Sequence, residues 1–116
     1  MWETDLTDTH LSGAVAVGDI FNRANLTRAF LSGAMLNDAT FGDVSFTGAA
    51  LNQVKLRGAD LDGADLTRAN LTDADLTGAD LSGANLTDAT LTGATPTGVV
   101  HDGHTLWPRG FAPPPR

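Results

Sequence analysis

Few residues of this 116-residue chain are of the types that carry out catalysis or bind metals. Cysteine is absent, which excludes thiolate metal ligands, cysteine nucleophiles and disulfide bonds. One cluster resembles a ligand set: His101, Asp102 and His104, whose two histidines could share an ion if the segment were helical. Gly103 and Pro108 argue against a helix. A structural role is therefore the preferred interpretation, and metal binding is the alternative.

Aspartates recur along the chain, and pairs such as Asp60 and Asp80 are of the type used in general acid–base catalysis. That chemistry needs a cleft that excludes water and separates the two pKa values. The sequence contains no nucleophile–base pair, phosphate-binding loop or cofactor fingerprint. We therefore expect no enzymatic activity, no cofactor and no bound metal.

An internal repeat of five residues determines how these side chains are positioned. From Asp60 the chain reads D-L-D-G-A, D-L-T-R-A, N-L-T-D-A, D-L-T-G-A, D-L-S-G-A. We call the large apolar residue of each repeat its centre. Eighteen centres run from Leu6 to Leu91 without an insertion, and fourteen of them are leucine. The residue two positions before the centre is small, and it is alanine in thirteen repeats.

A period of five fits neither an α-helix nor a flat strand. On a helix, at ~100° per residue, successive centres would lie ~140° apart, and on a strand they would alternate between faces. A chain that turns a corner once per repeat places every centre on one side, and four corners close a coil of twenty residues. The centre and the small residue before it then point inward. The other three positions point outward, and Gly, Asn, Asp and Thr supply the turns.

The A-(D/N)-L-x-x tandem resembles the pentapeptide-repeat family over about residues 4–95. The resemblance implies an all-β fold, a right-handed quadrilateral β-helix with four pentapeptides per coil. Eighteen repeats then make about 4.5 coils, with a cap at each end. We expect a repeat domain over residues 1–95, and a capping segment with a mobile proline-rich end over residues 96–116.

Hydrophobic residues near both termini are candidates for covering the end coils. Trp2 is expected to lie over Leu6. The T-x-W-P-x-G-F ending, from Thr105 to Phe111, is similar to the terminal segment of many bacterial pentapeptide-repeat proteins. Four residues of the tail are predicted to form a hydrophobic plug: Val99, Leu106, Trp107 and Phe111. The alternative is that this aromatic tail binds a partner.

Two further features have both a structural and a functional interpretation. Asp19 falls on an inward position, where a carboxylate needs a partner such as Arg23. A local bulge at Gly18 that turns Asp19 outward is the preferred interpretation.

An outward threonine column could order water, as in ice binding, but threonines that bond their neighbours on stacked strands explain it better. The column consists of Thr7, Thr27, Thr47, Thr67 and Thr87.

The outward positions are not uniform along the rod. Five apolar residues cluster on the first two coils, where later coils carry Asp, Asn, Thr and Lys. They are Val15, Val17, Ile20, Phe30 and Met35. Clustered exposed apolar residues indicate a contact surface, so we interpret this set as a candidate interface and expect a homodimer.

Acidic residues collect on other outward positions and form a candidate acidic wall: Asp43, Asp60, Asp62, Asp65, Asp80, Asp88 and Asp102. The formal net charge of −7 argues against direct binding to nucleic acid or to an anionic membrane surface. No apolar run approaches the ~20 residues that span a bilayer, and no signal peptide is recognisable. We therefore expect a cytoplasmic protein that acts through protein partners.

The resemblance also suggests a particular partner. One branch of the pentapeptide-repeat family protects DNA gyrase from quinolones by imitating duplex DNA. A net charge of −7 is about half that of a duplex as long as 4.5 coils, at one charge per ~1.7 Å. The preferred function is therefore a non-catalytic protein-interaction scaffold. The alternatives are an acidic DNA mimic that acts on gyrase or topoisomerase, and a structural module or fragment of a longer protein.

Overall fold

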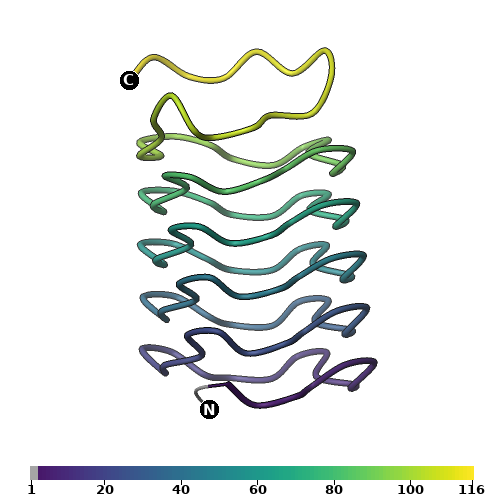
Figure 1. The fold of residues 1–116 in the computed structure, drawn as a ribbon. Helices are drawn as coiled ribbons and strands as arrows, with labels where there is room; N and C mark the ends of the chain where they lie inside the picture. Colours follow the sequence, from purple (N-terminus) through teal and green to yellow (C-terminus); the bar gives the residue numbers. More distant parts are fainter. Residues whose placement is uncertain (1–2) are drawn as a thin grey trace.

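The computed structural model describes residues 3–116 and shows a rod formed by one continuous coil (Figure 1). Its principal extents are 32 × 22 × 21 Å. Within residues 3–116 there is no helix, and no strand longer than a single bridging residue. This range thus contains no helix long and apolar enough to cross a membrane. Trp2, which the sequence predicts to lie over Leu6, is outside the described residues.

Parallel pairing between successive coils holds the rod together. A bridging residue occurs at every fifth position from Asp5 onward, and it pairs with the residue twenty positions later as far as Asp80 with Val100. From the second coil onward, a bridging residue uses both of its backbone groups in bonds to the preceding coil. The N–H of Asp65, for example, donates to Val44 O at 2.9 Å, and its carbonyl accepts from the N–H of Phe46 at 2.7 Å. The predicted coil of twenty residues is confirmed by this pairing.

Four columns of bridging residues run along the rod, and we call them walls. The first wall starts at Asp5, the second at His10, the third at Val15 and the fourth at Ile20. Each wall takes one residue from each coil. Residues twenty apart in the sequence therefore lie side by side on the same wall.

A turn separates each wall from the next. The N–H of the residue three after the centre donates to the carbonyl of the centre, as from Ala64 to Leu61 at 3.0 Å. The second residue after the centre has φ between 55° and 74° at every turn from Glu3 to Gly98. Positive φ at the third turn residue alone is the mark of a type II turn. Glycine occupies half of these positions because the left-handed region costs it little.

The preference for Asp or Asn before the centre also has a backbone cause. The residue after the centre directs its N–H to the Oδ1 of the Asp or Asn two positions earlier, as Asp62 does to Asp60 at 3.0 Å. This is an Asx turn. In Thr72 the hydroxyl bonds the same oxygen of Asn70, at 2.6 Å. Three members of the outward threonine column make this hydroxyl bond: Thr7, Thr27 and Thr87.

The interior is filled by the centres and the small residues two positions before them, as predicted. Every centre from Phe21 to Leu86 is at most 6% exposed, and every small residue from Ala24 to Ala89 is buried. Centres one coil apart stack directly, and the rings of Phe21 and Phe41 lie 5.0 Å apart at 8°. No coil has a core of its own, because each is buried only by the coils on either side.

Asp19 takes its inward position without the bulge that the sequence predicts at Gly18. Gly18 has φ of 74°, as at the other turns, and the N–H of Asp19 keeps the turn bond to Ala16 O at 3.2 Å. The bulge prediction is therefore wrong. Asp19 is exposed because it belongs to the first coil, where it lines a cavity at the end of the rod.

Leu71→Asp is expected to prevent folding, because it places an unpaired charge in a fully buried interior column. The adjacent Asn70 is exposed, and Asn70→Asp keeps the acceptor oxygen that Thr72 uses. This control should unfold close to the wild-type temperature. Circular dichroism and thermal unfolding check both variants. A Leu71→Asp protein that is soluble and melts cooperatively would contradict this interior.

Candidate protein-binding surfaces

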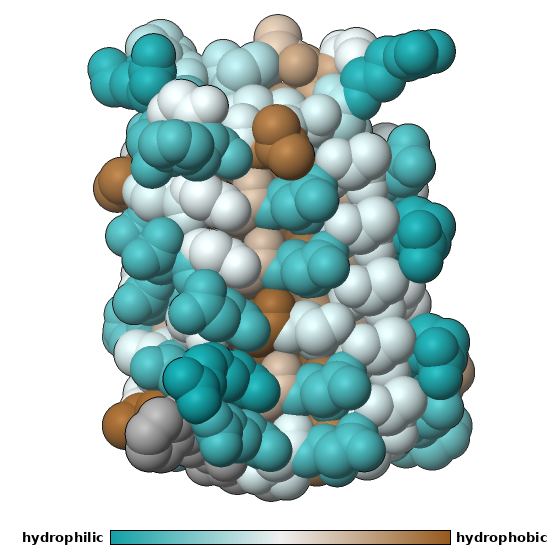
Figure 2. Space-filling view, in the orientation of Figure 1, coloured by the Kyte–Doolittle hydropathy of each residue, from teal (hydrophilic) through white to brown (hydrophobic). Residues whose placement is uncertain are grey.

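Exposed apolar side chains gather on the first two coils. We call the following set the apolar patch: Val15, Val17, Ile20, Phe30 and Met35. Its members are 43–70% exposed. Among residues 3–116, the other large apolar side chains with high exposure are Val100 and Leu106. Figure 2 shows one face of the rod, where polar residues form columns along the axis and hydrophobic atoms emerge at separate places between them.

The third and fourth walls contribute most of the apolar patch. Val15 and Met35 are bridge partners on the third wall, as the twenty-residue period predicts. Ile20 is the first bridging residue of the fourth wall. Val17 lies in the turn between these two walls. The patch is therefore continuous around one corner of the rod.

Phe30 extends the apolar patch onto the second wall, where it pairs with His10. The two rings stack with centroids 4.8 Å apart and an interplanar angle of 6°. Sequence reasoning missed His10, although its spacing of twenty residues from Phe30 was the available signal. An exposed imidazole thus adds a polar edge to the patch.

Five aspartates lie together on the fourth wall and in the turn after it, and we call them the fourth-wall aspartates: Asp43, Asp60, Asp62, Asp80 and Asp102. Asp62 has a raised pKa, first because burial disfavours its charged form and then because of nearby carboxylates. Those carboxylates belong to Asp80, Asp60, Asp43 and Asp102. Asp60 and Asp80 are bridge partners on the fourth wall. The structure therefore brings the predicted fourth-wall aspartates together, on an outer face and not in a cleft.

Asp65 and Asp88, which the sequence also assigns to the acidic wall, lie elsewhere. Asp65 belongs to the first wall, between Ser45 and Asn85, and Asp88 lies in the turn that follows that wall. Burial acts to raise the pKa of Asp65, but hydrogen bonds from Thr67 outweigh it and the pKa is lowered. Neither residue is among the carboxylates that act on Asp62.

The pairing register changes by one residue at the C-terminal end. Asn85 bridges Leu106, at a spacing of twenty-one residues instead of twenty. Thr105 consequently takes the inward position two before the next centre, and its hydroxyl donates to Leu81 O at 2.9 Å. Trp107 becomes that centre and packs against the core. The coil therefore continues past residue 95, where the repeat pattern ends, with one residue inserted after Val100.

Three of the four predicted plug residues pack over the last coil. Val99 is 7% exposed. The ring of Trp107 stacks on Phe111 at 5.2 Å and meets His101 edge-on at 5.3 Å. Leu106 is the exception, because the register change gives it an outward bridging position and leaves it 53% exposed. The prediction that Leu106 belongs to the plug is therefore wrong.

His101, Asp102 and His104 do not converge on one point. His101 Nε2 lies 2.7 Å from Pro114 O. Asp102 accepts the backbone N–H groups of Gly83 and His104 at 3.1 and 2.9 Å. The side chain of His104 is 90% exposed. In the described range 3–116, no three His, Asp or Glu side chains are arranged to hold a metal ion.

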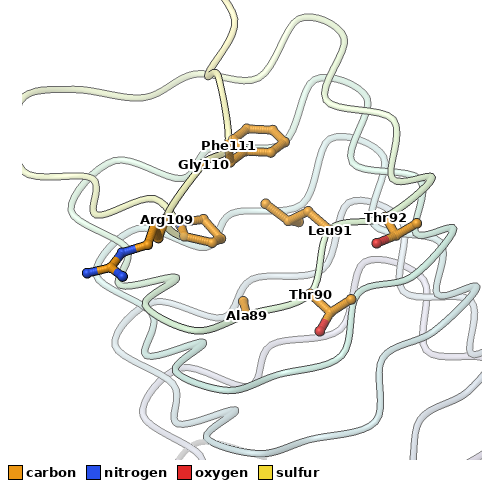
Figure 3. A pocket seen from close by; sticks show the side chains of 8 residues that line it. Ala89, Thr90, Leu91, Thr92, Arg109, Gly110 and Phe111 are labelled. Carbon is orange, nitrogen blue, oxygen red and sulfur yellow. The ribbon is translucent and has the colours of Figure 1, made fainter.

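An open space of about 390 Å³ lies between the last coil and the tail. Residues 89–92 form one side and residues 108–111 the other. Figure 3 shows Leu91 and Phe111 bordering this space, while the side chain of Arg109 leads away from it. A further coil would continue the second wall here, so the space marks the place where coil pairing ends.

Trp107→Ala is expected to lower the free energy of unfolding by on the order of 1–2 kcal/mol, because Trp107 is partly buried and covers the last coil. Leu106→Ser is the matched control and should change stability little, since Leu106 is exposed. Thermal and denaturant unfolding measure both. An unchanged unfolding midpoint for Trp107→Ala would instead assign the tail to partner binding.

Asp62→Asn is expected to raise the thermal midpoint at neutral pH. The pKa of Asp62 is raised above its ordinary value of 3.8, so folding favours the protonated form. The contribution of this carboxyl to stability is then greatest below the ordinary pKa and is lost as pH rises through the folded pKa. The gain from Asp62→Asn should shrink in acid and in molar salt. A lower midpoint at neutral pH would contradict this sign.

The chain matches the family model of pentapeptide repeats in eight copies, over residues 3–43, 44–83 and 69–98. Pentapeptide repeat protein Rfr23 from the cyanobacterium Cyanothece 51142 is similar, with 24% identity, a TM-score of 0.54, and coverage of 91% of this chain and 89% of that one. A pentapeptide repeat protein of the Arabidopsis thaliana thylakoid lumen is 35% identical with a TM-score of 0.58, over 83% of this chain and 63% of that one.

QnrB1, a plasmid-mediated fluoroquinolone resistance protein, is also similar in structure. It is 20% identical with a TM-score of 0.54, over 91% of this chain and 66% of the trypsin-treated form. This identity shows a shared fold alone. No curated protein matches the chain. The family match over residues 3–98 and the parallel coils of the structure establish that the chain belongs to the pentapeptide-repeat family and has a right-handed β-helix fold.

Proposed function

We propose that this protein is a non-catalytic protein-binding module and that the apolar patch is its binding surface. The observation that carries this proposal is the exposure of five clustered apolar side chains, at 43–70%, on the first two coils. Most other outward positions are polar. An apolar cluster on a solvated wall contributes nothing to the interior, so contact with another protein is its best use.

The turn chemistry supports the same conclusion. Eight bridging positions within residues 3–116 carry Asp or Asn, whose Oδ1 accepts the N–H of the turn, as in Asn70 with Thr72 at 3.1 Å. The apolar side chains of Phe30 and Met35 at equivalent positions cannot accept this bond, and neither can Ala50 or Lys55. Turn chemistry therefore does not call for Phe or Met at these positions, and a contact function explains large apolar side chains there.

The proposed binding module is a rigid coil that carries the apolar patch on its outside. The coil is four-sided, with about 4.5 turns formed by the eighteen repeats. The repeats display the walls up to residue 95, the coil continues to Val100, and the tail that follows forms the cap. Such a coil presents outward side chains at a rigid spacing of ~4.8 Å along each wall. Binding of a partner to the apolar patch therefore costs the rod little conformational entropy.

A second candidate function is favoured by the fourth-wall aspartates, four of which act on the charge of Asp62. In this function the wall stands in for duplex DNA on DNA gyrase or topoisomerase. QnrB1, the fluoroquinolone resistance protein, shares the fold. The charge is low for this role: the net charge is −7 over a length of 32 Å, where a duplex carries roughly 19 charges at one per ~1.7 Å. We therefore place DNA mimicry second.

Affinity capture from a lysate of the source organism, with matched variants as bait, tests the first function. Phe30→Ser/Met35→Ser removes apolar area from the patch without touching the interior. Asp60→Asn/Asp80→Asn is the control, since it removes charge from the fourth wall and keeps its acceptor oxygens. We expect a protein that binds the wild type and the control but is lost from the patch variant.

A gyrase supercoiling assay with the same three proteins tests the second function. Inhibition or protection that is lost only in Asp60→Asn/Asp80→Asn would move the function to the acidic wall. Capture of a protein that is lost from the aspartate variant and kept by the patch variant would also assign the function to the acidic wall. The first proposal would then be rejected.

A further inference from the structure

The two ends of the rod differ in how they are closed. At the C-terminal end the tail runs across the last coil (Figure 1), with Trp107 packed against the core. At the N-terminal end a cavity of about 120 Å³ reaches into the first two coils. Leu11 and Ala16 line it and are only partly buried. Their equivalents one coil later, Leu31 and Leu36, are at most 2% exposed.

On the third wall, the first coil of the described chain has unpaired backbone groups at Val15. On the third wall, the N–H of Met35 donates to Ala14 O at 2.8 Å, and the carbonyl of Met35 accepts from the N–H of Ala16 at 2.9 Å. Val15 holds the same place one coil earlier. Neither its N–H nor its carbonyl has a hydrogen-bond partner within residues 3–116. Both groups face the open end, because both groups of Met35 face the preceding coil.

This edge is complementary to a second copy of itself. In an antiparallel ladder, two opposed residues form a hydrogen-bonded pair by exchanging both of their N–H···O bonds. A two-fold axis at the open end brings Val15 of one copy opposite Val15 of another in this arrangement. Head-to-tail stacking is the other way to pair the edge, but the tail covers the C-terminal end and such stacking does not close.

We propose that a second copy of this chain docks end-on against the first coil, with the two Val15 residues paired across a two-fold axis. The dimer uses the backbone edge of Val15, whose side chain also belongs to the apolar patch, and it does not require the partner of the proposed function. It keeps the homodimer expected from the sequence and places the contact at the end of the rod. Along the third wall, Val15 and Met35 of both copies form one apolar stripe. The contact also covers the cavity of each copy.

The area and the charge at this end fit a concentration-dependent dimer. The cross-section of 22 × 21 Å gives roughly 450 Å² per copy, about 900 Å² in total, which is at the low end for specific interfaces. Two of the four acidic residues in the first coil form ion pairs, Glu3 with Arg23 and Asp8 with Arg28. Asp5 and Asp19 are exposed and form no ion pair among residues 3–116, so the dimer should strengthen as salt is added.

A charge-swap experiment tests the two-fold pairing. Sedimentation velocity is measured over a micromolar concentration series for the wild type, Val15→Glu, Val15→Lys, and an equimolar mixture of the two variants. The wild type should dimerise, and each variant alone should be monomeric because like charges face each other across the axis. The mixture should dimerise again. Val15 is 70% exposed, so both variants should keep the wild-type thermal midpoint.

Met35→Glu is the matched control, with the same charge placed one coil from the edge. In a dimer of this variant, the new carboxylates of the two copies would lie about three strand spacings apart, ~14 Å. This separation is beyond the Debye length of ~8 Å at physiological ionic strength. This variant should therefore dimerise like the wild type. A monomeric wild type at high micromolar concentration overturns the proposal. So does a dimer that Met35→Glu abolishes and the Val15 variants preserve. Neither outcome bears on capture of a different protein by the apolar patch.

Discussion

Hydrogen bonding between consecutive coils is the interaction on which the rest of this rod depends. From the second coil to Val100, both backbone groups of each bridging residue bond to the coil that lies twenty residues earlier. This pairing stacks the centres in columns, and only the stacking buries them. Burial therefore falls toward the ends, where a coil has a neighbour on one side: Leu51 is fully buried, whereas Leu11 and Leu91 are partly exposed.

The corners impose a second constraint, which falls on the outer surface. Each turn leaves an N–H that needs an acceptor, and Asp or Asn before the centre supplies it. Where Thr40 or Lys55 holds that position, the acceptor oxygen can come instead from an Asn of the preceding coil. Asn22 Oδ1 accepts the N–H of Gly42, and Asn37 Oδ1 accepts that of Arg57, both at 3.0 Å. Much of the polar surface is thus set by turn geometry, and departures from it are informative.

These departures divide the surface into regions of different chemistry. The apolar patch occupies the first two coils, and the fourth-wall aspartates lie further along the rod, from Asp43 to Asp102. Because the interior is the same in every repeat, differences between repeats fall on the outward positions. The scaffold therefore holds two distinct surfaces on one rigid body. Under the proposed function, the choice between these surfaces decides which partner is bound, since fold alone does not determine function.

The sequence by itself determined the coil, its period, its interior and the two surfaces, because a strict five-residue repeat is compatible with one arrangement of the chain. It could not determine what happens where the repeat fails. The tertiary structure decided that Leu106 faces outward, because one residue is inserted into the pairing after Val100. It also decided that Asp19 stays in register and that Asp65 lies apart from the fourth-wall aspartates. Burial at an end depends on what lies beyond the last coil, and a repeat pattern carries no information about that.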